Sequence, residues 1–87
     1  MRASVWDTYV LREDGKHMHF DILVPDSLQD ESTIFNYGRE YLKDKCFETK
    51  GLTSNECHFC HMEKATADIE KEIKAKGYYV IEMENCS

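Results

Sequence analysis

Two stretches near the start of the chain alternate between apolar and polar residues, which is the pattern of half-buried β-strands. The first runs from Ser4 to Leu11 and is rich in β-branched and aromatic residues. The second runs from Lys16 to Val24 and alternates over its whole length. Asp14-Gly15 lies between them and is a common turn pair, because both central positions of a tight hairpin turn tolerate positive φ. The pattern therefore predicts a β-hairpin.

The length of the hairpin loop sets which side chains share a face. With a two-residue loop, Tyr9 lies opposite Phe20 and Thr8 lies opposite Asp21. One face then carries Val5, Tyr9 and Leu11 with Met18, Phe20, Ile22 and Val24. The other face carries Trp6, Thr8 and Val10 with His19, Asp21 and Leu23.

Two later stretches show the three- and four-residue spacing of helices that bury one face. The first is expected from about Asp30 to Lys45, and its apolar stripe consists of Ile34, Tyr37, Gly38, Tyr41 and Leu42. A glycine on that stripe costs helix stability, so we expect Gly38 to permit close approach to the sheet. The second helix is expected from Thr66, its N-cap, to Lys76, with Gly77 as the stop.

The remaining segments complete an α+β fold. Leu52-Thr53-Ser54 is a candidate short strand, and Tyr78 to Met83 predicts a final strand. An irregular turn or short helix is expected through the cysteine segment near residue 57. The alternative is one long helix that begins at Thr53, whose capping box is completed by Glu56. The predicted order is β-β-α-(β)-α-β in a single domain, residues 1–87, with both helices on one face of a three- or four-stranded sheet.

The composition and charge of the chain argue against several classes of partner and location. Eleven basic and 17 acidic residues give a net charge of 11 − 17 = −6, which argues against nucleic acid and against an anionic membrane surface as partners. The first residues lack the apolar run of a signal peptide, and no stretch approaches the about 20 apolar residues of a membrane span. We therefore expect a cytoplasmic protein whose four cysteines are reduced or metal-bound.

Cysteine and histidine cluster in a way that suggests a metal site. The segment Cys57-His58-Phe59-Cys60-His61 holds two thiols and two imidazoles, and His17 and His19 share one strand. A C-x-x-C turn lets two thiolates occupy two corners of a zinc tetrahedron. The predicted ligands are Cys57, Cys60, His61 and Cys86, with His19 as first reserve. Such a zinc ion would have a structural or partner-binding role. The competing interpretation, given equal weight, is that the cysteines are reduced and packed and the histidines are surface residues.

Other chemistry is compatible with the same residues. Cys57-x-x-Cys60 could serve a thiol-dependent redox protein, although no βαβ unit precedes it. The letters Cys-x-x-Cys-His also match a haem-attachment motif, which the expected cytoplasmic location argues against. His17, His19 and Asp21 could form an acid–base row. A plain interaction module, such as a homodimer that pairs edge strands, is a further alternative, and whether the protein is an enzyme stays open.

Asp7 stands out because it lies among apolar residues of the first strand. If it is buried, it requires a hydrogen-bond partner, and otherwise it marks the edge of the sheet.

Several of these motifs together resemble a small bacterial family of uncharacterised proteins, domain-of-unknown-function family number two thousand and twenty-four. The resemblance is carried by Asp7-Thr8-Tyr9-Val10, Met18-His19-Phe20-Asp21, Glu56 to His61, Gly77-Tyr78, Met83 and Cys86. It spans nearly the whole chain apart from the loop that holds Cys46 and Phe47. The resemblance implies a compact α+β fold and associates His19, Asp21, Cys57, Cys60, His61 and Cys86 with the family's motifs. It implies no activity.

Overall fold

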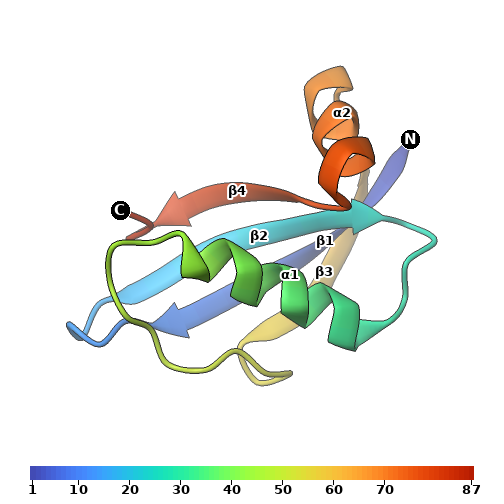
Figure 1. Cartoon of the computed structure of the whole chain (residues 1–87). Helices are drawn as coiled ribbons and strands as arrows, with labels where there is room; N and C mark the ends of the chain where they lie inside the picture. The colour runs from blue at the N-terminus through green and yellow to red at the C-terminus, as the bar shows by residue number, and fades with distance from the viewer.

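Four strands and two helices alternate along the chain in the order β-β-α-β-α-β. The computed structural model describes residues 1–87 (Figure 1). The elements are β1 (Arg2–Leu11), β2 (His17–Pro25), α1 (Glu31–Lys43), β3 (Cys57–Lys64), α2 (Ala67–Lys76) and β4 (Tyr79–Glu84). The predicted α+β class and element order are confirmed, α1 begins close to the expected Asp30, which is its N-cap, and α2 begins at its expected N-cap, Thr66.

The sheet is antiparallel throughout, with the strand order β3-β1-β2-β4. β1 and β2 form the predicted hairpin, but its register differs from the prediction by one residue. Arg12 and Lys16 close the loop through a backbone hydrogen bond of 2.8 Å, and Gly15 has a φ of +90°. The loop therefore has three residues, the length that uses a glycine of positive φ as its last member. Thr8 lies opposite Phe20 rather than Asp21, and Asp7 takes the place opposite Asp21.

This one-residue shift turns the side chains of β1 to the other face of the sheet. Trp6, Thr8 and Val10 share a face with the apolar set of β2, where the sequence placed Val5, Tyr9 and Leu11. Val5 instead shares the second face with Leu23, and both lie in a smaller core cluster.

The two helices pack on opposite faces, whereas one face was expected for both. Helix α1 lies across the face of Phe20 and buries Ile34 against it (Figure 1). Helix α2 covers only one end of the other face, where Ile73 packs with Val5 and Leu23. The chain needs both placements because each face of the hairpin carries apolar residues. One consequence is that the rest of the second face, including Asp7 and His19, has no helix over it.

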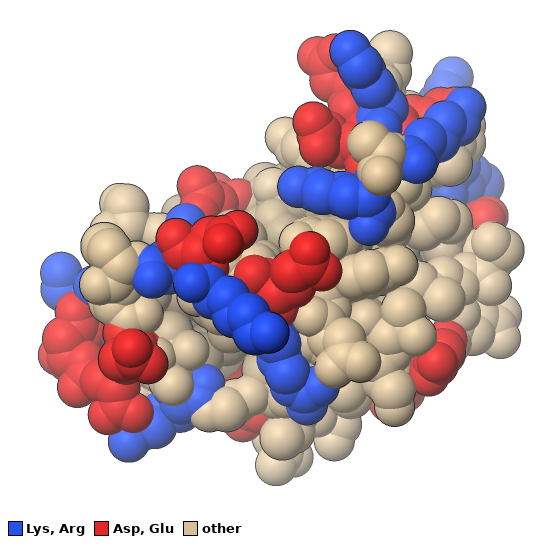
Figure 2. Space-filling view, in the orientation of Figure 1, with Lys and Arg blue, Asp and Glu red and all other residues tan.

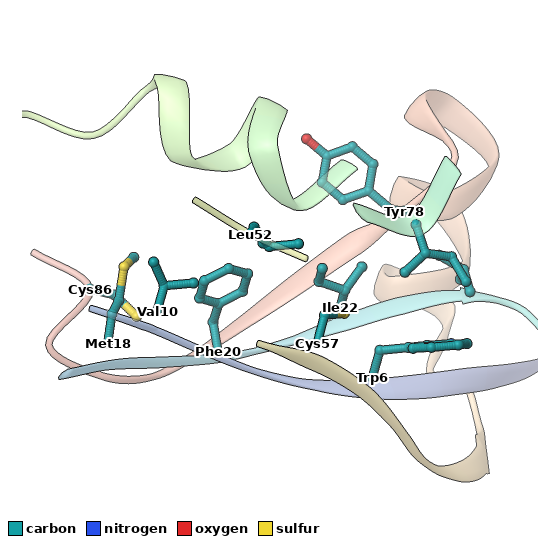
Figure 3. Packing of buried hydrophobic residues seen from close by; sticks show 11 residues of the cluster. Trp6, Val10, Met18, Phe20, Ile22, Leu52, Cys57, Tyr78 and Cys86 are labelled. Carbon is teal, nitrogen blue, oxygen red and sulfur yellow. The ribbon is translucent and has the colours of Figure 1, made fainter. Parts of the chain in front are cut away.

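Gly38 lies on the buried face of α1, next to Leu52 and the sheet residue Ile22. A Cβ atom added there would lie 2.7 Å from Leu52 Cδ1 and 3.1 Å from Ile22 Cδ1. Figure 3 shows Leu52 between the helix and the sheet, above Phe20 and Ile22. Leu52 was expected to begin a short strand but lies in a loop instead. Its side chain is 2% exposed and fills the core from that loop.

The cysteine segment is neither a turn nor a helix. Residues 57–64 form the edge strand β3, which pairs with β1. One of the two capping-box contacts of the alternative interpretation forms, because Glu56 Oε1 accepts hydrogen bonds from the backbone N–H and the hydroxyl of Thr53 at 2.7 Å. They close a turn that leads into the strand rather than a helix. Neither helix of the fold is long and apolar enough to cross a membrane.

Candidate functional site

Three polar side chains meet on the face of the sheet that α2 leaves open. Asp7 of β1 and Asp21 of β2 are direct cross-strand partners, and His19 lies two residues before Asp21 on the same face. One ligand-type atom from each of the three lies within 4.8 Å of the others. The corrected hairpin register makes this cluster, since directly opposed residues of antiparallel strands have neighbouring side chains.

Irregularities in both flanking strands border the cluster. The pairing of β3 with β1 shifts between Val5 and Trp6, which leaves Cys60 as an extra residue. The pairing of β4 with β2 shifts between His19 and Phe20, which leaves Met83 as an extra residue. Such bulges bend a strand and redirect a side chain, and they are enriched beside functional sites. Here the first bulge places Cys60 beside Asp7, which raises the pKa of its thiol.

The imidazole of His19 lies between the two carboxylates without a hydrogen bond to either. Its Nε2 atom is 3.8 Å from Asp7 Oδ1 and 3.6 Å from Asp21 Oδ1. The His19 Nε2 and Asp21 Oδ1 atoms are buried and have no hydrogen-bond partner. A buried polar atom without a partner destabilises a fold, so this arrangement requires a physical reason.

The two carboxyl groups titrate as a pair with opposite shifts. Burial, then the hydrogen bond and the negative charge of Asp7, raise the pKa of Asp21 to about 6. The hydrogen bond from Asp21 is the largest cause that lowers the pKa of Asp7. Two close carboxylates behave in this way because they share one proton more easily than they carry two charges. The site therefore concentrates negative charge at neutral pH, which a cation can neutralise.

Tyr9 forms one wall of the site. Its ring stacks on the imidazole of His19 at 4.2 Å between centroids, with an angle of 11° between the planes. The tyrosine ring itself is 52% exposed. The stacking restricts rotation of the imidazole and keeps Nε2 directed at the carboxylates.

The four predicted zinc ligands do not come together. Cys57 is buried in the main core, 3.4 Å from the hydroxyl of Thr8, and Cys86 is buried beside Met18 at another end of that core (Figure 3). Cys60 and His61 are exposed, and their Sγ and Nδ1 atoms are 3.2 Å apart. Only this second pair borders the cluster, so of the predicted set the structure assembles Cys60, His61 and the reserve residue His19.

The placement of the thiols also bears on redox chemistry. Cys57 and Cys60 lie on opposite faces of β3, with Cys57 against Thr8 and Cys60 against Asp7. Burial raises the pKa of Cys57, and the hydrogen bond with Asp7 is the main cause that raises the pKa of Cys60. Neither thiol is therefore activated as a thiolate in the way that exchange chemistry requires.

Asp7 is the member of this cluster that the sequence-based prediction did not include. Its position among apolar residues was the available signal, and the side chain proves to be half-buried. Asp7 lies opposite Asp21 on the neighbouring strand, and it does not mark the sheet edge because β1 is a central strand. The interpretation of His17, His19 and Asp21 as an acid–base row identified two of the three residues.

Comparisons with known proteins place the chain without assigning a role. The family model described as Domain of unknown function (DUF2024) matches residues 1–83. A solved structure, the NMR structure of protein NE1680 from Nitrosomonas europaea, is 37% identical, with a TM-score of 0.85 and 100% of both chains covered. No curated protein matches the chain.

Proposed function

The chain belongs to the DUF2024 family, and we propose that it binds one divalent transition-metal ion, of which zinc is the best fit, on the open face of its sheet. The ligands are Asp7, His19 and Asp21, with the Cys60 thiolate in the fourth position. This set replaces the one expected from the Cys-x-x-Cys motif. The observation that carries the proposal is the unpartnered imidazole nitrogen that faces two carboxylates across gaps too long for hydrogen bonds.

The spacing of the donor atoms suits an ion between them. Zinc lies about 2.0–2.2 Å from nitrogen and oxygen ligands, so two ligand atoms of one tetrahedral ion are separated by about 3.4 Å. The two measured separations of 3.6 and 3.8 Å exceed a hydrogen bond and fall close to that value. A mixed set of imidazole, carboxylate and thiolate also suits zinc better than magnesium or calcium, which prefer oxygen alone.

A bound cation would reverse the electrostatics of the site. The negative charge of Asp7 raises the pKa of both Asp21 and Cys60. An ion among these groups favours their charged forms, because a thiol or carboxyl must lose its proton to coordinate metal. Binding should therefore release protons, and the apparent affinity should fall steeply as the pH drops below about 6, where Asp21 is protonated.

The location of the site favours an exchangeable ion over a structural one. The main core and the smaller cluster under α2 are built from apolar side chains that do not include the proposed ligands. Cys60 is exposed and Asp7 is half-buried, so the ion would have an open route to solvent. We therefore assign the protein a role in the uptake and release of a metal ion, or in chemistry at an accessible ion, rather than folding around one.

Isothermal titration of the full, tag-free chain with zinc at pH 7.5 tests the proposal. We expect one equivalent to bind, and we expect His19→Gln and Asp21→Asn each to weaken binding by at least about tenfold, the scale of losing a metal-site group. Cys57→Ala and Cys86→Ala are the matched controls. They remove thiols of the Cys-x-x-Cys hypothesis and should leave the affinity unchanged.

Two outcomes would contradict the proposal. Absence of saturable binding at zinc concentrations up to about 100 μM, the range of weak specific sites, would remove it. Loss of binding in Cys57→Ala and Cys86→Ala with retention in His19→Gln would instead support the original cysteine ligand set. Circular dichroism of each variant separates lost ligands from lost structure.

A further inference from the structure

A second concave surface lies on the other side of the molecule, between α1 and the loop that follows it. The groove has a volume of about 460 Å³. Its helix side is formed by residues 39–45 and its loop side by residues 47–52, and we call it the α1 groove. It lies on the α1 side of the sheet, whereas the proposed metal ligands lie on the face that α1 does not cover.

The α1 groove is positively charged although the protein is acidic. Its lining contains four basic residues, Arg39, Lys43, Lys45 and Lys50, and one acid, Glu48. The formal charge of the lining is 4 − 1 = +3, and the net charge of the chain is −6, so the remainder carries −9. Figure 2 shows Lys and Arg side chains crossing the surface over α1, between groups of acidic side chains.

Two of these cations are not neutralised by the protein. Lys45 pairs with Glu82 at 2.5 Å, and Lys50 pairs with Glu13 at 3.3 Å. Arg39 is bonded only to neutral acceptors, Asn36 Oδ1 at 2.7 Å and the carbonyl oxygen of Leu52 at 2.8 Å. Those two bonds hold the guanidinium in place and leave other N–H donors free.

Lys43 completes the pair of free charges. It makes no ion pair, and it lies four residues after Arg39 on the same side of α1. Two free cations one helical turn apart match a dianionic group, for which arginine supplies the planar donor geometry and lysine a point charge.

Apolar side chains line the groove beside these cations. Leu42, Phe47 and Leu52 are its three hydrophobic lining residues. The Arg12 guanidinium lies 3.6 Å from the centroid of the Phe47 ring and holds that ring in place. A ligand with an anionic group and a small apolar body would therefore contact both kinds of surface, as small-molecule sites require.

We propose that the α1 groove binds a small organic phosphate, with the phosphate at Arg39 and Lys43 and the apolar body against Phe47. The proposal is independent of the metal site, because it uses no residue of that site and the opposite side of the sheet. A negative result for the phosphate site would therefore not bear on the metal site, and the reverse also holds.

The test is an NMR titration of the ¹⁵N-labelled full chain with phenyl phosphate. We expect saturable amide shifts within residues 39–52 and a dissociation constant of about 1 mM or lower, the scale of a small polar ligand. Inorganic phosphate, the anion alone, and phenol, the body alone, should each bind at least about fivefold more weakly, because each lacks one half of the contacts. Added sodium chloride should weaken phenyl phosphate but not phenol.

Lys43→Gln is the decisive variant, since its exposed side chain makes no contact that the fold needs. We expect it to weaken phenyl phosphate about two- to fivefold, the scale of an exposed ion pair. Lys71→Gln makes the same substitution on α2, at an exposed lysine that also lacks an ion pair, and should have no effect. Equal effects of the two variants, shifts spread over the whole surface, or no saturation by about 10 mM would overturn the proposal.

Discussion

Replacing Asp21 by asparagine should stabilise the metal-free protein at neutral pH while it weakens metal binding. The pKa of Asp21 is raised to about 6 because the carboxylate is buried beside Asp7. Ionisation of Asp21 therefore costs folding free energy that the unfolded chain does not incur. An asparagine stays neutral at every pH and can still donate a hydrogen bond to Asp7, as the protonated acid does.

The size of this effect follows from the difference between the two pKa values. The pKa of Asp21 rises from the ordinary 3.8 to about 6, a difference of about 2 pH units, and each unit corresponds to about 1.4 kcal/mol. Ionisation of Asp21 therefore lowers the free energy of unfolding by at most about 3 kcal/mol. Asp7 offsets part of it, because its own pKa is lowered and its ionisation favours the folded state. We expect a net gain of about 1–3 kcal/mol at pH 7.5, which in a domain of this size raises Tm by at least about 4 °C.

The sign of the pH dependence provides the sharper measurement. A raised folded-state pKa gives a contribution that is fully present below about pH 4 and is lost as the pH rises through about 6. Wild type should therefore lose this contribution over that interval, whereas Asp21→Asn should not. The advantage of the variant should be near zero at pH 4 and largest at pH 7.5.

Urea unfolding of wild type and Asp21→Asn between pH 4 and pH 8, with chelator present, measures this difference directly. Asp26→Asn, which changes an exposed turn residue, controls for net charge. In the presence of zinc the advantage of the variant should shrink or reverse, because wild type binds zinc more tightly and gains more of the stabilisation that a bound ligand provides. A variant that is less stable than wild type by the same amount at both pH 4 and pH 7.5 would refute the reasoning.

Three further predictions concern the fold and the site. Gly38→Ala should destabilise the protein by about 1–3 kcal/mol in urea unfolding, because the added Cβ would lie 2.7 Å from a Leu52 methyl in a packed core. Arg12→Ala should cost about 2–4 kcal/mol in the same assay, since the buried guanidinium donates to main-chain oxygens of Asn85 and Ser87 and packs on the Phe47 ring, and alanine removes these contacts. Tyr9→Ala should weaken zinc binding severalfold without changing its stoichiometry, because the ring that orients His19 is removed.

Local chemistry accounts for the elements that could be read from the sequence. The stripe on α1, its start near Asp30 and the N-cap of α2 at Thr66 depend on residues within a few positions of one another, and the structure has them as predicted. β3 could not be recognised in this way. It is an edge strand with six of its eight residues exposed, so its side chains do not alternate between core and solvent. Its hydrogen bonds come from β1, about 50 residues earlier.

The candidate site was likewise predictable in its residue types but not in which residues meet. The sequence indicated His19, Asp21, Cys60 and His61 as chemically interesting, because imidazoles, carboxylates and thiols are the groups that hold metals. It did not reveal that Asp7 belongs with them, since the turn pair Asp14-Gly15 is compatible with both a two-residue and a three-residue hairpin loop. That difference reverses the face of every side chain on β1.

By itself, the sequence determined the α+β class, the order of the elements and the residue types available for chemistry, because these depend on composition and short-range periodicity. Tertiary structure decided which of those residues meet. Packing of apolar side chains on both faces of the sheet drew Cys57 and Cys86 into the core on the α1 side. The same packing left Asp7, His19 and Asp21 together on the part of the other face that α2 is too short to cover.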